Sequence, residues 1–211
     1  MKNISCVLVL APHTDDGEVG CGATLAKLIE SGADVYYAAF SICEASVPDG
    51  FPRDILATEV KTATQSLGIP PENLIVYRYP VRHFPQHRQE ILENLVQLRK
   101  QIDPDLVFLP SFDDIHQDHH TIAREGVRAF KHVSTLGYEM PWNNLTFTAS
   151  TFVHLEERHL TRKIEAINHY HSQKHRNYVT DDFITSLAKV RGTQAGTEYA
   201  EAFQAIRWML R

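Results

Sequence analysis

The chain has 211 residues and a formal net charge of −5, and 43% of its residues are hydrophobic. This composition excludes an intrinsically disordered chain, and the length suits a single domain over residues 1–211 with a real buried core. The negative charge and the lack of a long basic run argue against nucleic acid as a partner.

The cysteines and the first strand-like run bear on the cellular compartment. Cys6, Cys21 and Cys43 cannot all pair and show no C-x-x-C spacing, which is typical of reduced, packed thiols. The apolar stretch over residues 6–11 is too short for a signal peptide or a membrane span. We therefore expect a cytoplasmic protein with no membrane span.

Strand-like and helix-like segments alternate along the chain. A continuous apolar run over residues 4–11 suits a strand that is buried on both faces. We expect further strands over 34–40, 74–77 and 106–109, with an edge strand over 145–153. Helices are expected over 19–29, 54–67, 86–101, 121–130, 156–170, 184–189 and 199–210. This order predicts βαβ units, and hence an α/β fold with a mostly parallel sheet.

The first polar segment, Pro12-His13-Thr14-Asp15-Asp16, follows the first expected strand. Ligands of parallel sheets bind beyond the carboxyl ends of the strands. A turn there can aim His13 and Asp16 at one point, with Asp15 facing the same cavity. One carboxylate would bind a divalent metal, and the other would take a proton from a water that the metal activates. Alternatively, Asp15 or Asp16 only caps the following helix.

The glycines of Gly17-Glu18-Val19-Gly20-Cys21-Gly22 could belong to a dinucleotide-binding site or could allow close packing of a helix, and the second interpretation fits better. Their order is G-x-x-G-x-G rather than G-x-G-x-x-G, and the two preceding aspartates would repel a pyrophosphate. They therefore predict tight turning and close packing of a helix on the sheet.

The second polar segment, Asp114-Ile115-His116-Gln117-Asp118-His119-His120, follows the fourth expected strand. His116 lies one helical turn before His119, and His120 also suits this geometry. One histidine would bind the metal while the other points at an oxyanion, and Asp118 would fix an imidazole tautomer. The alternative is a polar loop with solvated histidines. Taken together, the two segments predict a metal-dependent hydrolase.

With both segments in view, the chain resembles the LmbE-like or PIG-L family of zinc-dependent N-acetylglucosaminyl deacetylases. The family motifs A-H-P-D-D-E and H-P-D-H correspond to Pro12-His13-Thr14-Asp15-Asp16-Gly17 and to His116-Gln117-Asp118-His119. Residues 59–68, 170–173 and 191–203 are also similar, so the resemblance spans nearly the whole chain. Departures from the pattern are Thr14, Gly17 and Gln117, and Leu56 stands where the family often has an arginine, with Arg53 one turn earlier.

The resemblance implies a Rossmann-like three-layer sandwich and a set of roles. His13, Asp16 and His119 would bind Zn²⁺, which favours His119 over His120. Asp15 would be the general base. A protonated His116, supported by Asp118, would stabilise the oxyanion. The resemblance also implies a homo-oligomer, a trimer or a hexamer.

The expected function is removal of the N-acetyl group from an N-acetylglucosamine-type amino-sugar conjugate, a small-molecule substrate. Two alternatives stay open: an amidase acting on another sugar-linked carbon–nitrogen bond, and a non-enzymatic module that binds a nucleotide or a metal. The metal is also open, because two histidines and one carboxylate form the non-haem Fe²⁺ set as well.

Overall fold

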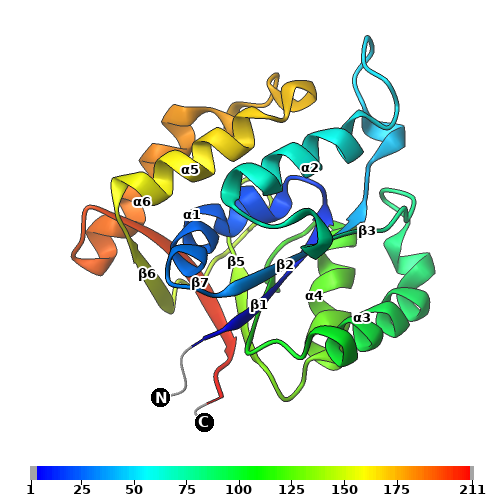
Figure 1. Cartoon of the computed structure of the whole chain (residues 1–211), viewed down its shortest axis with the longest axis horizontal. Coiled ribbons are helices and arrows are strands. Elements are labelled where there is room, and N and C mark those ends of the chain that lie inside the picture. Colours follow the sequence, from blue (N-terminus) through cyan, green and yellow to red (C-terminus); the bar gives the residue numbers. More distant parts are fainter. Residues whose placement is uncertain (1–3, 210–211) are drawn as a thin grey trace.

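The computed structural model describes residues 4–209, in which one seven-stranded sheet lies between two layers of helices (Figure 1). The strands are β1 (Cys6–His13), β2 (Asp34–Ser41), β3 (Leu74–Val76), β4 (Leu106–Pro110), β5 (Ser134–Tyr138), β6 (Thr151–Leu155) and β7 (Tyr199–Arg207). They run in the order β3-β2-β1-β4-β5-β7-β6. Strands β3, β2, β1, β4 and β5 pair in parallel, and β7 lies antiparallel between β5 and β6. The predicted mostly parallel sheet is confirmed.

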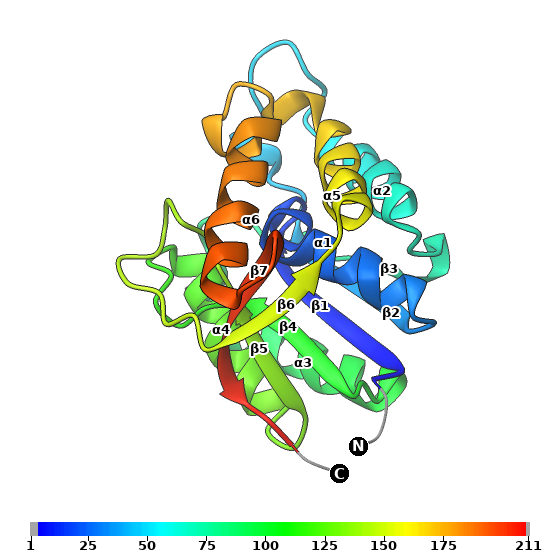
Figure 2. The same cartoon turned by 90° about the vertical axis from the view of Figure 1, so that its left-hand side faces the viewer.

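The helices divide between the two faces of the sheet (Figures 1 and 2). They are α1 (Asp16–Glu30), α2 (Ile55–Leu67), α3 (Arg88–Ile102), α4 (Gln117–Ala129), α5 (Glu157–Asn168) and α6 (Asp181–Ala195). Residues of α1, α2, α5 and α6 share one hydrophobic core, and residues of α3 and α4 share the other. This arrangement is the expected Rossmann-like three-layer sandwich.

Strand β1 shows why the sheet separates two cores. Val7 and Val9 belong to the core under α1 and α2, whereas Leu8 and Leu10 belong to the core under α3 and α4. Successive side chains of a strand point to opposite faces, so a continuous apolar run serves both layers. The prediction of a strand buried on both faces is confirmed.

Two glycines at the start of α1 let the helix approach the sheet closely. A Cβ atom on Gly17 would lie 2.5 Å from the Tyr37 ring, and one on Gly20 would lie 2.5 Å from the Tyr138 ring. Any larger residue would push α1 away from β2 and β5. The packing role predicted for these glycines is confirmed.

The largest difference from the expected elements lies at the C-terminal end. Residues 199–207 form β7 rather than a helix; Leu210, within the expected helix, lies outside the described residues. Alanine, glutamate and glutamine favour helices on propensity alone. Here β5 and β6 each offer an edge to this segment, and pairing with both overrides that local preference. Strand β5 itself was not predicted, because Ser134–Tyr138 is short and contains a glycine.

Two further expectations concern cysteines and membranes. Cys6, Cys21 and Cys43 are all free, as expected. None of the helices between residues 4 and 209 combines the length and the apolar character that a bilayer crossing requires.

Candidate active site

The two polar segments meet at the reversal point of the strand order. From β1 the chain continues to β2 on one side, and β4 lies on the other side. Open α/β sheets bind ligands at such a switch point, beyond the carboxyl ends of the strands. His13 ends β1, Asp16 begins α1, and His119 lies in the first turn of α4, after β4. Residues about a hundred positions apart thus lie together.

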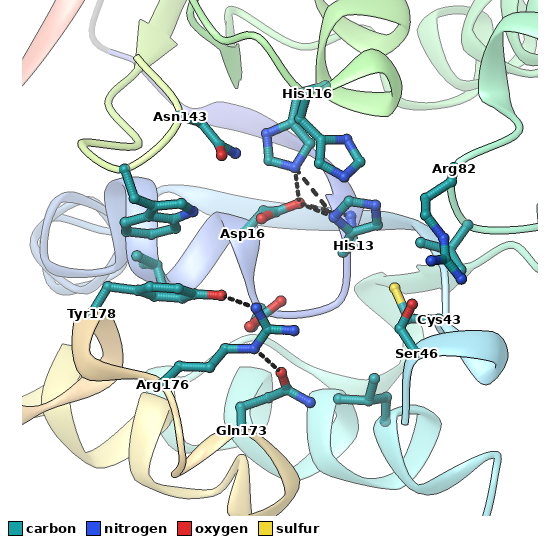
Figure 3. Close-up of a pocket in the computed structure, with 16 residues that line it drawn as sticks. His13, Asp16, Cys43, Ser46, Arg82, His116, Asn143, Gln173, Arg176 and Tyr178 are labelled. Carbon is teal, nitrogen blue, oxygen red and sulfur yellow. Dashed lines mark hydrogen bonds and ion pairs between the residues drawn. The ribbon is translucent and has the colours of Figure 1, made fainter. Parts of the chain in front are cut away.

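Three side-chain atoms from these elements form a small triangle, and Figure 3 shows two of the residues, His13 and Asp16, side by side. Asp16 Oδ2 lies 3.2 Å from His13 Nδ1 and 3.2 Å from His119 Nε2. The two ring nitrogens are themselves 3.2 Å apart. The structure therefore brings together the three residues for which the sequence analysis expected a metal-binding role.

Two further carboxylates orient the imidazoles. Asp118 Oδ2 lies 3.1 Å from His13 Nε2, and Asp114 Oδ2 lies 2.7 Å from His119 Nδ1. Each of these ring nitrogens donates its proton to the carboxylate, which leaves a lone pair on the opposite nitrogen. When both imidazoles are neutral, these lone pairs lie on His13 Nδ1 and His119 Nε2 and face Asp16 Oδ2.

This triangle fits a divalent metal ion. Ligands at the usual bond lengths of a tetrahedral zinc site lie roughly 3.3–3.5 Å from one another, close to the observed 3.2 Å. His116 adds a further nitrogen, and ligand nitrogens of His13, His116 and His119 all lie within 4.8 Å of one another. Two imidazoles and a carboxylate suit zinc and also Fe²⁺.

The charges of the cluster are strongly coupled. Burial opposes ionisation of Asp16, but His119 and His13 hold the pKa of its carboxyl well below the usual range. Burial likewise disfavours a charged His119, but Asp16 and Asp114 raise its pKa to about 10. The metal-free cluster therefore keeps a proton on His119, and metal binding has to release it.

Asp15 lies beside the triangle, in the wall of the cavity that contains it, and its carboxylate does not cap helix α1. It stands at the N-cap of α1, yet its side chain makes no capping hydrogen bond. The capping alternative therefore does not describe it. Burial, followed by the neighbouring Asp16, raises the pKa of Asp15 to about 6. A carboxylate with such a pKa accepts a proton more readily than an exposed one.

His116 differs in charge from the sequence-based expectation. Its Nδ1 accepts a hydrogen bond of 3.2 Å from the backbone N–H of Asp118, and so cannot carry a proton there. Burial, together with His13 and His119, lowers its pKa to about 4. The side chain is therefore a neutral imidazole with Nε2–H as its donor, whereas the sequence analysis expected an imidazolium.

Asp118 also has a different partner from the one expected. It was assigned to support His116, but its carboxylate contacts His13. Its oxygens further accept from the backbone N–H groups of Arg82 at 2.5 Å and Phe84 at 3.1 Å. Arg82 adopts a left-handed backbone with φ of 70°, a strained conformation that tends to persist at functional sites. In this conformation the Arg82 N–H points at Asp118.

His120, the other candidate ligand of the second segment, lies away from the triangle. It is exposed, and its Nε2 accepts a hydrogen bond of 3.3 Å from Arg124 Nε. Of the two candidates, His119 therefore lies at the triangle and His120 does not.

A buried network supports the turn that carries the first segment. The hydroxyls of Tyr37 and Tyr170 donate to the Thr14 carbonyl at 2.8 and 2.7 Å, and both also contact the Glu18 carboxyl. Burial is the main cause that raises the pKa of Glu18 to about 8. Glu18 therefore keeps its proton to a higher pH than an exposed glutamate, beneath the turn that carries the first segment.

A cavity of about 220 Å³ lies in front of the triangle. Its other lining residues come from several loops and helices: Val19, Cys43, Ser46, Leu56, Val81, Arg82, Trp142, Asn143, Gln173, Arg176 and Tyr178. The sequence analysis gave no role to Asp114 or Arg176. Asp114 stands two residues before His116, and Arg176 follows the family-like segment 170–173. Their positions next to these segments could have identified both as candidates.

Comparisons with known proteins agree with this geometry. The family model of PIG-L, described as GlcNAc-PI de-N-acetylase, matches residues 8–130. An uncharacterized deacetylase from Escherichia coli K12, YaiS, is 28% identical over 171 residues, which cover 79% of this chain and 90% of that protein.

Two solved structures share the fold. The conserved protein TT1542 from Thermus thermophilus is 25% identical, with a TM-score of 0.80 and coverage of 99% of this chain and 97% of the other. The N,N'-diacetylchitobiose deacetylase from Pyrococcus horikoshii, in complex with an inhibitor, is 20% identical, with a TM-score of 0.79 and coverage of 97% and 84%. With a family model that matches more than half of its residues and a histidine-rich metal-binding group in its cavity, this chain belongs to the PIG-L family and is a metal-dependent deacetylase.

Proposed function

We propose that the protein hydrolyses the N-acetyl amide of an N-acetylglucosamine-type amino-sugar conjugate, releasing acetate and a free amine. The observation that carries this proposal is the position of Asp15, beside the donor triangle of His13, Asp16 and His119 and in the wall of the same small cavity. One carboxylate is committed to the triangle, and the other is left to move a proton.

We assign the metal site to His13, Asp16 and His119. A divalent ion held there would supply Lewis acidity, polarising the amide carbonyl and lowering the pKa of a water molecule. Asp114 and Asp118 hold the two imidazoles in the tautomers that leave their lone pairs free. Zinc is the expected ion, and Fe²⁺ has a compatible ligand set.

The remaining polar groups carry the proton chemistry. Asp15 would take a proton from the attacking water and deliver it to the leaving nitrogen, so that the amine departs neutral. The Nε2–H of His116 would donate a hydrogen bond to the amide oxygen as negative charge develops on it. A neutral imidazole can fill this role because it donates without needing an extra proton.

Two features support an N-acetylated sugar as the substrate. The cavity is small, which suits an acetyl group and a single ring rather than a large acyl chain. The family description and the Pyrococcus horikoshii enzyme both refer to deacetylation of N-acetyl sugars. Since the second likeness is 20% identical, the sugar has to be determined by experiment.

Amine release from a panel of N-acetylated sugars tests the proposal. Protein loaded with Zn²⁺ or Fe²⁺ should release amine and acetate in equal amounts from at least one N-acetylglucosamine derivative, and Asp15→Asn should not. Cleavage of other sugar-linked amides, but of no N-acetyl group, would instead favour the alternative amidase. Absence of any amide cleavage by fully loaded protein would contradict the proposal.

A further inference from the structure

Arg176 is a half-buried guanidinium in the wall of the active-site cavity (Figure 3). Its Nε donates to Gln173 Oε1 at 2.7 Å, and its Nη1 donates to the Tyr178 hydroxyl at 2.5 Å. Tyr178 in turn stacks on Trp142, with ring centroids 3.7 Å apart and an interplanar angle of 11°. The guanidinium is therefore held from two sides.

A chain of buried polar side chains fixes the orientation of Gln173. Glu59 on α2 is 4% exposed and accepts from the Ser172 backbone N–H at 2.9 Å and from the Ser172 hydroxyl at 2.6 Å. Gln173 Nε2 donates to that hydroxyl oxygen at 3.1 Å, which turns its carbonyl oxygen toward Arg176. Burying the Glu59 carboxylate is costly unless it is hydrogen-bonded. Its hydrogen bonds to Ser172 begin a chain of hydrogen bonds that continues through Gln173 to the guanidinium.

Part of the guanidinium stays available to a ligand. A guanidinium has five N–H donors, and the Nη2 group of Arg176 makes no hydrogen bond within residues 4–209. Nor does an ion pair join Arg176 or the other cavity arginine, Arg82, to a carboxylate in that part of the chain. By contrast, Arg191 pairs with the buried Glu139.

The overall charge of the cavity points the same way. Arg82 and Arg176 balance the formal charges of Asp15 and Asp16 among the lining residues. Any divalent ion on the donor triangle then makes the cavity net positive, which favours an anionic ligand.

We propose that Arg176 anchors an oxyanion of the substrate, so that the protein acts on an anionic amino-sugar conjugate. The inference rests on the proposed function. Arginine matches phosphate and carboxylate groups through paired N–H donors. Because Arg176 and the donor triangle share one small cavity, the anionic group lies within about one ring of the scissile amide. The anomeric substituent, next to the carbon that carries the acetamido group, meets this requirement.

A set of matched substrates tests the anchor. N-acetylglucosamine is compared with its 1-phosphate and with its carboxymethyl glycoside, so that the neutral sugar, a phosphate and a carboxylate are separate arms. The wild-type protein should show a higher kcat/KM for at least one anionic sugar, by about 10–100-fold, the usual worth of a hydrogen bond to a charged group. The preferred arm identifies the oxyanion.

Variants assign that preference to Arg176. Arg176→Gln should bring the ratio of kcat/KM between the anionic and the neutral sugar close to one, and Arg176→Lys should keep part of the wild-type ratio; the ratio is compared because the charge of Arg176 also acts on Asp15. Arg53→Gln is the matched control, because Arg53 is exposed and does not line the cavity. Thermal unfolding of each variant shows whether it is folded.

Calorimetry on the products provides a readout that is independent of turnover. Glucosamine 1-phosphate, and glucosamine carrying the same carboxymethyl group, should bind the wild-type protein more tightly than glucosamine does, and Arg176→Gln should remove the difference. Equal use and equal binding of neutral and anionic sugars, or a preference that survives in Arg176→Gln, would overturn the proposal. Lack of turnover on every sugar would count against the proposed function instead, and the binding comparison would still decide the role of Arg176.

Discussion

Helix α1 contacts two buried polar clusters that differ in how their hydrogen-bonding groups are paired. In the first cluster, Lys163 Nζ donates to Glu201 Oε1 at 2.7 Å and to the Val19 carbonyl at 2.6 Å. The Glu201 carboxylate also accepts from the backbone N–H groups of Ala23 and Thr24, at 3.2 and 2.7 Å. Opposite charges are paired, and donors point at acceptors.

In the second cluster, the triangle of His13 Nδ1, His119 Nε2 and Asp16 Oδ2 at the start of α1, all three atoms are acceptors once His119 has released its proton. The two imidazole lone pairs and the Asp16 carboxylate oxygen converge within 3.2 Å, and outer carboxylates hold them there. An arrangement of this kind has a deficit that a cation can fill. The comparison teaches that a paired cluster stabilises the fold, whereas a cluster of converging acceptors indicates a binding site.

The largest expected effect concerns the base beside the triangle. Asp15→Asn should keep the fold and the metal, because Asp15 is not part of the triangle, and should lower kcat by about 10²–10⁴-fold, the usual worth of a positioned general base. Asp16→Asn should lose metal and activity together. The measurement is metal content beside amine release. A loaded Asp16→Asn protein next to a metal-free Asp15→Asn protein would reverse the two roles.

Breaking the paired cluster should affect stability rather than chemistry. Glu201→Ala leaves the buried Lys163 ammonium without its partner, and should lower the free energy of unfolding by about 3–5 kcal/mol. The protein that remains folded should bind metal as the wild type does. Denaturant unfolding and metal analysis check both parts. An unchanged stability would show that the ion pair is not the element that holds α1 to α5 and β7.

A smaller effect is expected from the outer carboxylates of the triangle. Asp114→Asn and Asp118→Asn should each weaken metal affinity by about 10–100-fold, the usual cost of losing a partner that orients a ligand. Competition with a metal chelator measures this. Asp118→Asn should affect His13, and combining it with His13→Ala should add little further loss. If the losses of metal affinity in the two single variants add fully in the double variant, Asp118 does not act through His13.

The smallest effect concerns pH and the network beneath the turn. Folding raises the pKa of Glu18 from 4.5 to about 8, so the folded protein holds this proton more tightly than the unfolded chain does. Stability from this group is therefore present below about pH 4.5 and is lost as the pH rises toward 8. Glu18→Gln removes the titratable group and should flatten this dependence of stability on pH. Unfolding curves over this pH range, with and without the substitution, provide the check.

Much of the fold follows from local patterns in the sequence. The strand predicted over residues 4–11 corresponds to β1, whose residues 7–11 are buried, and its position next to Pro12-His13 placed the site at a strand end. The segment 199–207 was not predictable in this way. Its residues favour a helix locally, and it forms a strand only because β5 and β6 leave a space between them.

The site divides along the same line. His13 and Asp16 were candidate metal ligands from their residue types and spacing, whereas His119 was preferred over His120 only because of the resemblance to the PIG-L family. The partners of the imidazoles could not be identified, because spacing along the chain does not tell which carboxylate faces which ring. Asp118 is adjacent in sequence to His119, but its carboxylate contacts His13. It is also held by the backbone N–H of Arg82, which has a left-handed conformation. Arg176 depends on a chain of contacts that begins on α2.

The most direct test of the account is the metal content of three proteins, the wild type, His119→Ala and His120→Ala, each purified without added metal and then titrated with Zn²⁺ and Fe²⁺. His119 belongs to the triangle, whereas His120 is an exposed neighbour bonded to Arg124. We predict about one tightly bound ion per chain in the wild type and in His120→Ala, and a sharp loss in His119→Ala. Full occupancy in His119→Ala, or a loss in His120→Ala, would contradict the assignment of the metal site.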